Sequence, residues 1–159
     1  EAAGDQADIL IENLPANCWF FGGSWKAQFM TSGVELARFC GVQQMGATLD
    51  LCHLHLAAAN GALNVEAEIA AALPYVRHIH YSDARTHDDR GRHVNEEGLQ
   101  IGEGDMPLAR YLAALAPLRN LSFNVHAVPE IWYGHEHGGA GFLRAWELAE
   151  ALYKSPVEA

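Results

Sequence analysis

Short apolar runs alternate along the chain with segments whose apolar positions recur at helical spacing. The apolar runs predict strands within residues 8–13, 47–53, 76–84 and 121–128. The helical spacing predicts helices over residues 34–40, 65–73, 108–115 and 141–152, with Gly41 ending the first and Pro74 stopping the second. Gly22-Gly23-Ser24 indicates a loop, and a long polar loop is expected over residues 85–105. The chain therefore consists of four successive strand–helix units.

Four such units, with no hairpin signal between their strands, predict an α/β fold with a parallel sheet built through right-handed crossovers. They are too few to close an eight-stranded barrel, so the chain is expected to form half of a (β/α)₈ barrel or a small open sheet. An open half barrel would expose two sheet edges and one apolar face. We therefore expect it to be completed by a missing N-terminal half, a second copy or another chain. Residues 1–159 are assigned to one partial barrel domain, because this length suits a single core.

The overall charge disfavours one class of partner. Ten basic and twenty acidic residues give a formal net charge of -10, which would repel a nucleic-acid backbone.

The three cysteines, Cys18, Cys40 and Cys52, are odd in number and lack CxxC spacing, so the simplest compartment is a reducing cytoplasm. No apolar stretch approaches the roughly 20 residues of a membrane helix, so no membrane partner is expected.

Candidate chemistry lies at the ends of the four apolar runs, which carry Glu12, Asp50, His80 and Glu130. Taken singly, these residues have ordinary interpretations, such as a solvated carboxylate, a helix cap or a buried histidine. Their recurrence at all four strand exits instead favours a common site, because parallel strands end at one edge of a sheet. Three carboxylates and one imidazole suit Mn²⁺, Mg²⁺ or Co²⁺, with Zn²⁺ possible but not preferred.

These motifs resemble the C-terminal half of the xylose isomerase-like TIM-barrel superfamily, which includes sugar epimerases and isomerases, inosose dehydratases and endonuclease IV. In that superfamily the last four strands deliver Glu, Asp, His and Glu to a metal. The matching segments are Ile-Glu12-Asn, Leu-Asp50-Leu-Cys-His53, His80-Tyr-Ser-Asp83 and Pro-Glu130-Ile-Trp. The segment Ile101-Gly-Glu-Gly-Asp105 is also similar to the family's Gly-Glu-Gly loop.

The resemblance implies a metal-dependent isomerase or epimerase. Its substrate would be a sugar, a cyclitol or a related hydroxy-carbonyl compound, and a proton would move next to the carbonyl. Dehydration shares that first step. Glu12 and Glu130 are expected to act both as metal ligands and as acid and base, while Asp50 and His80 hold the ion. His53 would bind a substrate hydroxyl or shuttle a proton.

Further residues are candidates for substrate contacts. Trp19 and Trp132 could pack on a sugar ring, although filling the core is an equally good interpretation. Arg90 and His93 could meet a phosphate or carboxylate, or belong to a solvated loop. Asp83 would orient His80 or its loop. The substrate itself is not indicated by the sequence.

Two other functions stay open. The chain could be a binding or assembly subunit without its own catalysis, in which case a native dimer would close the barrel. An endonuclease IV-like phosphodiesterase is less favoured, because the segment 88–93 lacks the Asp-x-His spacing of that enzyme and the net charge is acidic. That activity predicts three bound metals and DNA binding that weakens strongly with salt.

Overall fold

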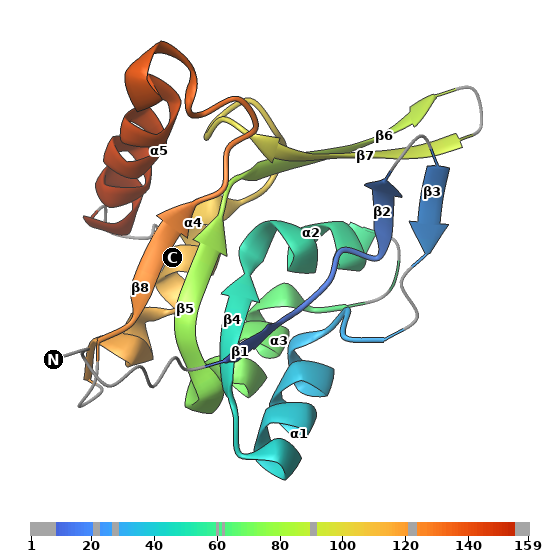
Figure 1. The fold of residues 1–159 in the computed structure, drawn as a ribbon, viewed down its shortest axis with the longest axis vertical. Helices are drawn as coiled ribbons and strands as arrows, with labels where there is room; N and C mark the ends of the chain where they lie inside the picture. Colours follow the sequence, from blue (N-terminus) through green and yellow to red (C-terminus); the bar gives the residue numbers. More distant parts are fainter. Residues whose placement is uncertain are drawn as a thin grey trace, which may run out of the picture.

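A computed structural model describes residues 9–20, 23–26, 29–59, 61, 63–89, 92–120 and 124–154. Its centre is a parallel sheet with the strand order β1-β4-β5-β8 (Figure 1). These strands are β1 (Leu10–Glu12), β4 (Gly46–Asp50), β5 (Val76–Tyr81) and β8 (His126–Pro129). The predicted parallel α/β sheet is therefore confirmed.

The helices follow the strands in chain order. They are α1 (Gly33–Gln43), α2 (Leu51–Ala59), α3 (Val65–Ala72), α4 (Leu108–Ala114) and α5 (Glu136–Lys154), with short 3₁₀ turns at Leu73–Tyr75 and Ala116–Asn120. Because the spatial order of the strands equals their chain order, each right-handed crossover turns the same way and places its helix on the same face. Helices α1, α3, α4 and α5 accordingly pack side by side, each against the next. In the described part of the chain, the other face carries no helix.

The core lies between this helical layer and the sheet. Leu49 and Ile79 on the sheet, together with Leu36, Ile69 and Leu112 on the helices, belong to one buried apolar cluster. Burial of apolar surface is worth about 25 cal/mol per Å², so this layer supplies most of the stability of the fold. The core fixes the strands, and through them the positions of their carboxyl ends.

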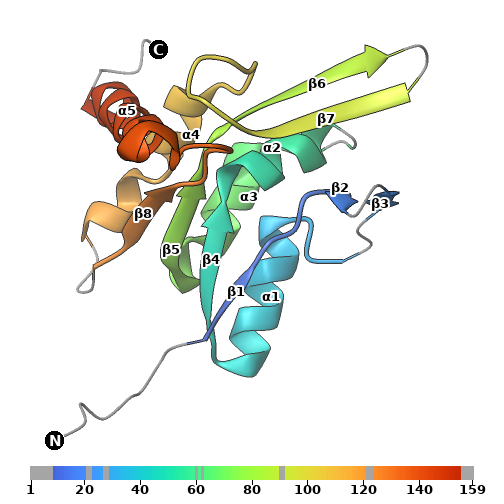
Figure 2. The same ribbon diagram turned by 45° about the horizontal axis from the view of Figure 1, so that its top comes forward.

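Two hairpins contradict the expectation that no strands pair locally. β2 (Asn17–Phe20) pairs antiparallel with β3 (Gly23–Lys26), so the predicted loop at Gly22-Gly23-Ser24 was wrong at Gly23 and Ser24. β6 (Asp83–Asp89) pairs antiparallel with β7 (Arg92–Leu99) inside the segment predicted as a polar loop. The β6–β7 hairpin crosses α2 and extends away from the sheet (Figure 2). It docks through Ala84, which is buried with Cys52 and Leu56 of α2.

Two smaller differences concern helices. Gly41 lies inside α1, which ends at Gln43; Gln44 then adopts a left-handed conformation with φ 56°. The strand predicted within residues 47–53 ends at Asp50, and the residues that follow form α2, which includes His53. Among the described residues the sheet does not close, and β1 and β8 are its edges. No helix in these residues is long and apolar enough to cross a membrane.

Candidate metal centre

Four neighbouring strands bring the four predicted side chains together. Glu12 is the last residue of β1, Asp50 the last of β4, His80 the penultimate residue of β5, and Glu130 follows β8. One potential ligand atom of each lies within 4.8 Å of those of the other three. They meet because the strands are parallel and in register, with His80 paired to Asp50 on one side and to Val128 on the other. The strand-end pattern in the sequence thus corresponds to one cluster in space.

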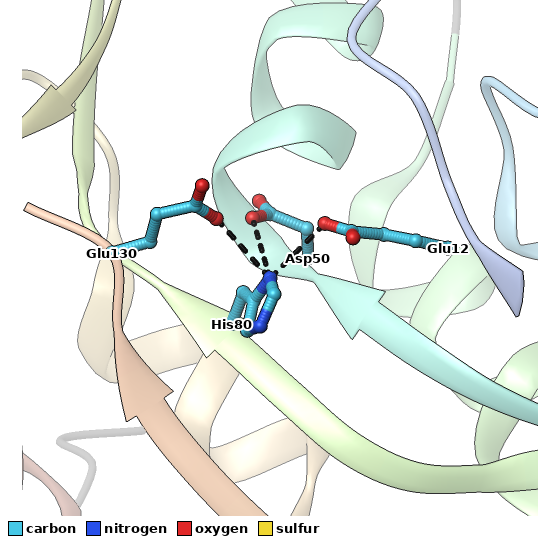
Figure 3. A group of neighbouring side chains, drawn as sticks. All are labelled: Glu12, Asp50, His80 and Glu130. Atoms are coloured by element: carbon cyan, nitrogen blue, oxygen red, sulfur yellow. Dashed lines mark hydrogen bonds and ion pairs between the residues drawn. The ribbon is translucent and has the colours of Figure 1, made fainter. Parts of the chain in front are cut away.

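The His80 imidazole stands at the centre of this cluster. Its Nδ1 lies 3.1 Å from Glu12 Oε1, 3.1 Å from Glu130 Oε2 and 3.9 Å from Asp50 Oδ2. The three carboxylates point at this nitrogen from different sides (Figure 3). A ring nitrogen carries at most one hydrogen, so it cannot serve all three carboxylates as a donor. Oxygen atoms and one nitrogen converging in this way are a donor set that fits a hard divalent cation.

Asp50 is held rigidly from two directions. Its Oδ1 accepts a hydrogen bond of 2.8 Å from the backbone N–H of His53, so it caps the start of α2. Its backbone N–H donates to Asn13 Oδ1 at 2.8 Å, and Asn13 Nδ2 donates to the Asp50 carbonyl at 2.9 Å. Asn13 is fully buried and was not foreseen as a site residue. Asp50 can therefore cap the helix and belong to the cluster at the same time, because Oδ1 caps α2 and Oδ2 remains directed at His80.

The clustered charges shift the protonation of the site. Burial raises the pKa of Asp50 to about 7, and the nearby Glu130 and Glu12 carboxylates add to this. Hydrogen bonds to Glu12 and Glu130 raise the pKa of His80 to about 10. The hydrogen bond with His80 in turn lowers the pKa of Glu130. The cluster therefore retains protons near neutral pH, and a metal ion would have to displace them.

His53 borders the cluster with a defined orientation. Its Nδ1 lies 2.8 Å from the carbonyl oxygen of Asn13, and because a carbonyl only accepts, Nδ1 carries a hydrogen. Its Nε2 is directed between two carboxylates, 3.9 Å from Asp50 Oδ2 and 3.9 Å from Glu97 Oε2. In the neutral ring this Nε2 is an acceptor facing the site. Glu97 comes from β7 and was missed, because nothing in its local sequence distinguishes it from Glu96.

Asp83 anchors the loop that follows the β6–β7 hairpin. Its Oδ1 accepts from the backbone N–H groups of Ala84 at 2.8 Å and Met106 at 3.2 Å, and its Oδ2 from those of Gly102 at 2.9 Å and Gly104 at 3.0 Å. A Cβ at Gly104 would overlap the Ala84 carbonyl, so the loop needs glycine there. Of the two roles predicted for Asp83, these contacts support the positioning of its loop.

The remaining predicted substrate contacts are only partly described. Trp132 is exposed, and its indole occupies the space that a Cβ at Gly98 would need. Trp19 lies in β2 and His93 in β7, but their side chains are outside the described part of the chain, as is the whole of Arg90. Contact of these four residues with a substrate remains a prediction.

Comparison with known proteins places this architecture in a family. A search of curated proteins finds no match to the chain. The family model of the xylose isomerase-like TIM barrel matches residues 1–151, a range that includes all four strand ends of the cluster. The chain therefore belongs to the xylose isomerase-like TIM barrel family.

Proposed function

We propose that the protein is a divalent-metal-dependent isomerase or epimerase that acts on a sugar, a cyclitol or a related hydroxy-carbonyl compound. The observation that carries this proposal is the convergence of Glu12, Asp50, His80 and Glu130 within 4.8 Å of one another. Membership of a family that contains sugar isomerases, epimerases and related enzymes supports it. Mn²⁺, Mg²⁺ or Co²⁺ would suit the oxygen-rich donor set.

The four residues divide into two pairs by the burial of their side chains and by the position of their strands in the sheet. The Asp50 side chain is almost fully buried and that of His80 mostly buried, and both sit on central strands, so they would hold the ion. Glu12 and Glu130 have side chains that are 34% and 56% exposed, on the two edge strands that flank the site. Their carboxylates can therefore contact both the ion and a substrate that approaches from the solvent side of the cluster, which we call the opening.

In the proposed reaction, one of these two carboxylates removes the proton from the carbon next to the substrate carbonyl. The electron pair of the C–H bond forms a carbon–carbon double bond, and the carbonyl oxygen takes the negative charge. Return of the proton to the former carbonyl carbon gives an isomer, because the hydroxyl on the other carbon then loses its proton to the former carbonyl oxygen and becomes the new carbonyl. Return of the proton to the opposite face of the original carbon gives an epimer. A bound divalent ion would supply Lewis acidity that favours the first step.

A phosphodiester substrate is less compatible with the same site. Four carboxylates, those of Glu12, Asp50, Glu97 and Glu130, lie in or beside the cluster, and the chain has a net charge of -10. A polyanionic nucleic acid would be repelled by this field. A non-catalytic binding or assembly subunit remains the alternative, since the described sheet is open at both edges.

Exchange of the substrate proton tests the proposal. The Mn²⁺-loaded protein is incubated in deuterium oxide with a panel of aldoses, ketoses and cyclitol ketones, and proton NMR follows the signal next to the carbonyl. We expect exchange with at least one compound, slowed about 100-fold or more in Glu130→Gln, because general acid–base groups contribute factors of this size. Glu136→Gln, on α5 and outside the cluster, is the control and should keep the full rate. A metal-loaded protein that exchanges no compound, or a Glu130→Gln variant with the wild-type rate, would refute this function.

A further inference from the structure

The β6–β7 hairpin carries an acidic side chain into the edge of the metal centre. Glu97 Oε2 lies 3.9 Å from His53 Nε2, and the Glu97 side chain is only 24% exposed. Consecutive residues of a strand point to opposite faces, and the neighbouring Glu96 points elsewhere, to Arg85 at 3.5 Å. Of the two adjacent glutamates, Glu97 therefore faces the site and Glu96 faces the arginine.

The fold fixes Glu97 in this position. The next residue, Gly98, has φ 67°, and its carbonyl accepts a 2.8 Å hydrogen bond from the backbone N–H of Trp132. The Trp132 indole fills the space beside Gly98 so closely that a Cβ there would overlap it. This contact joins the hairpin to the segment that follows β8, which also carries Glu130. Glu97 and the metal cluster are thus parts of one rigid arrangement.

His53 and Glu97 present the same kind of group to the opening. His53 Nδ1 carries its hydrogen toward the Asn13 carbonyl, so Nε2 of the neutral ring is an acceptor, and a carboxylate can only accept. His53 Nε2 and Glu97 Oε2 lie 3.9 Å apart, which is too far for a hydrogen bond between them. They can each accept from one of two neighbouring hydroxyl groups, as a vicinal diol would supply.

The charge of the opening adds a second requirement. Burial raises the pKa of the Glu97 carboxyl, and the Glu130 carboxylate raises it further, while His53 lowers it, so Glu97 shares the electrostatic field of the cluster. Once an ion has displaced the protons of the cluster, the carboxylates of Glu12, Asp50, Glu97 and Glu130 carry more negative charge than one divalent ion neutralises. Among the described residues, a phosphate or carboxylate group beside Glu97 would meet negative charge that no basic side chain of the cluster compensates.

We propose that Glu97 and His53 form a subsite for a vicinal diol, so that the centre selects uncharged polyhydroxylated substrates and rejects their phosphate esters. This role for Glu97 rests on the proposed function, since it assumes that the substrate binds at the metal centre. It makes Glu97 a specificity-determining residue of that site.

Binding of two related probes to the Mn²⁺-loaded protein tests the subsite. Calorimetry measures the affinity for xylitol, an uncharged polyol, and for xylitol 5-phosphate. We expect xylitol to bind more tightly to the wild type than its phosphate does. In Glu97→Gln the xylitol affinity should fall about tenfold or more, as for loss of a hydrogen bond to a charged acceptor, and the discrimination against the phosphate should shrink. Glu96→Gln is the matched control and should retain both properties.

Several outcomes would overturn this role. They are absence of xylitol binding to the wild type, tighter binding of the phosphate, and wild-type behaviour of Glu97→Gln. A fall in manganese content from two ions to one per chain in Glu97→Gln would instead make Glu97 a ligand of a second ion, and would also overturn it. Proton exchange in deuterium oxide distinguishes failure of the subsite proposal from failure of the proposed function. If only the subsite proposal is wrong, the wild type still exchanges the substrate proton. If the proposed function is wrong, the wild type shows no exchange.

Discussion

Replacement of Asp83 by asparagine should destabilise the protein severely. The Asp83 side chain is buried, and its two oxygens each accept hydrogen bonds from two backbone N–H groups, four in all. An amide keeps one oxygen and turns the other position into a donor that faces two donors. Whichever way the amide is oriented, two N–H groups lose their acceptor. Hydrogen bonds to charged groups are worth about 1.5–3 kcal/mol each, so the free energy of unfolding should fall by about 3–6 kcal/mol.

Urea unfolding followed by circular dichroism measures this loss, which is a large share of the about 5–15 kcal/mol that stabilises an ordinary domain. Asp105→Asn is the control in the same loop, because the Asp105 side chain is half exposed and its ion pair is with His55. The Asp105 carboxylate is half exposed, so solvent screens this pair, and the variant should lose at most about 1 kcal/mol. If Asp83→Asn lost less than the control, the four hydrogen bonds could not be what holds the loop.

Three further predictions use the same structure. Gly98→Ala should lower the free energy of unfolding by about 1–3 kcal/mol, because the added Cβ would overlap Trp132. The loss should exceed that of Gly102→Ala, because Gly102 also has a positive φ but has open space around it. Equal losses in the two variants would contradict the contact between Gly98 and Trp132. Asn13→Ala should lower the free energy of unfolding in urea by about 2–4 kcal/mol and weaken Mn²⁺ binding, because it leaves the buried backbone N–H and carbonyl of Asp50 without these partners. An unchanged Mn²⁺ affinity would show that metal binding by Asp50 does not depend on Asn13. Mn²⁺ affinity should rise with pH through about 7, because the ion must displace protons from Asp50, whose raised pKa is about 7, and from His80, whose raised pKa is about 10. Calorimetry in buffers of different ionisation enthalpy should detect the release of these protons. If Mn²⁺ bound without releasing protons, this protonation of the cluster would be contradicted.

The strands and the cluster at their ends could be predicted because both depend on local sequence. A short apolar run that closes on a polar residue, as in Leu10-Ile11-Glu12, specifies a strand and its exit in one pattern. Parallel pairing then brings the exits together without further information. His78 lies on the same strand as His80, with ring centroids 4.9 Å apart. His80, the predicted residue, is the one that joins the cluster, because it pairs in register with Asp50.

The β6–β7 hairpin could not be predicted in the same way. β6 reads Asp-Ala-Arg-Thr-His-Asp-Asp, which has no alternation of apolar and polar residues. Its stability comes from pairing with β7 and from burial of Ala84 against α2, both of which are tertiary contacts. The sequence 89–92 contains one glycine between polar residues, which does not by itself distinguish a hairpin turn from a polar loop.

The supporting residues of the site were missed for a related reason. Asn13 stabilises Asp50 across 37 positions of sequence, and Glu97 reaches His53 only because the hairpin folds over α2. Neither residue belongs to a local pattern that differs from an ordinary polar surface. The residues of the cluster were thus visible in the sequence, whereas the residues that orient or border the cluster became visible only in the fold.

The manganese content of the protein tests the central claim most directly. The chain is soaked in Mn²⁺, desalted and analysed for the metal, together with Asp50→Asn, Glu130→Gln and the control Glu136→Gln. If Glu12, Asp50, His80 and Glu130 bind one ion, the wild type and the control will retain about one manganese per chain, and the two site variants will lose it. A wild type that retains no manganese, or site variants that retain as much as the wild type, would contradict the existence of this centre.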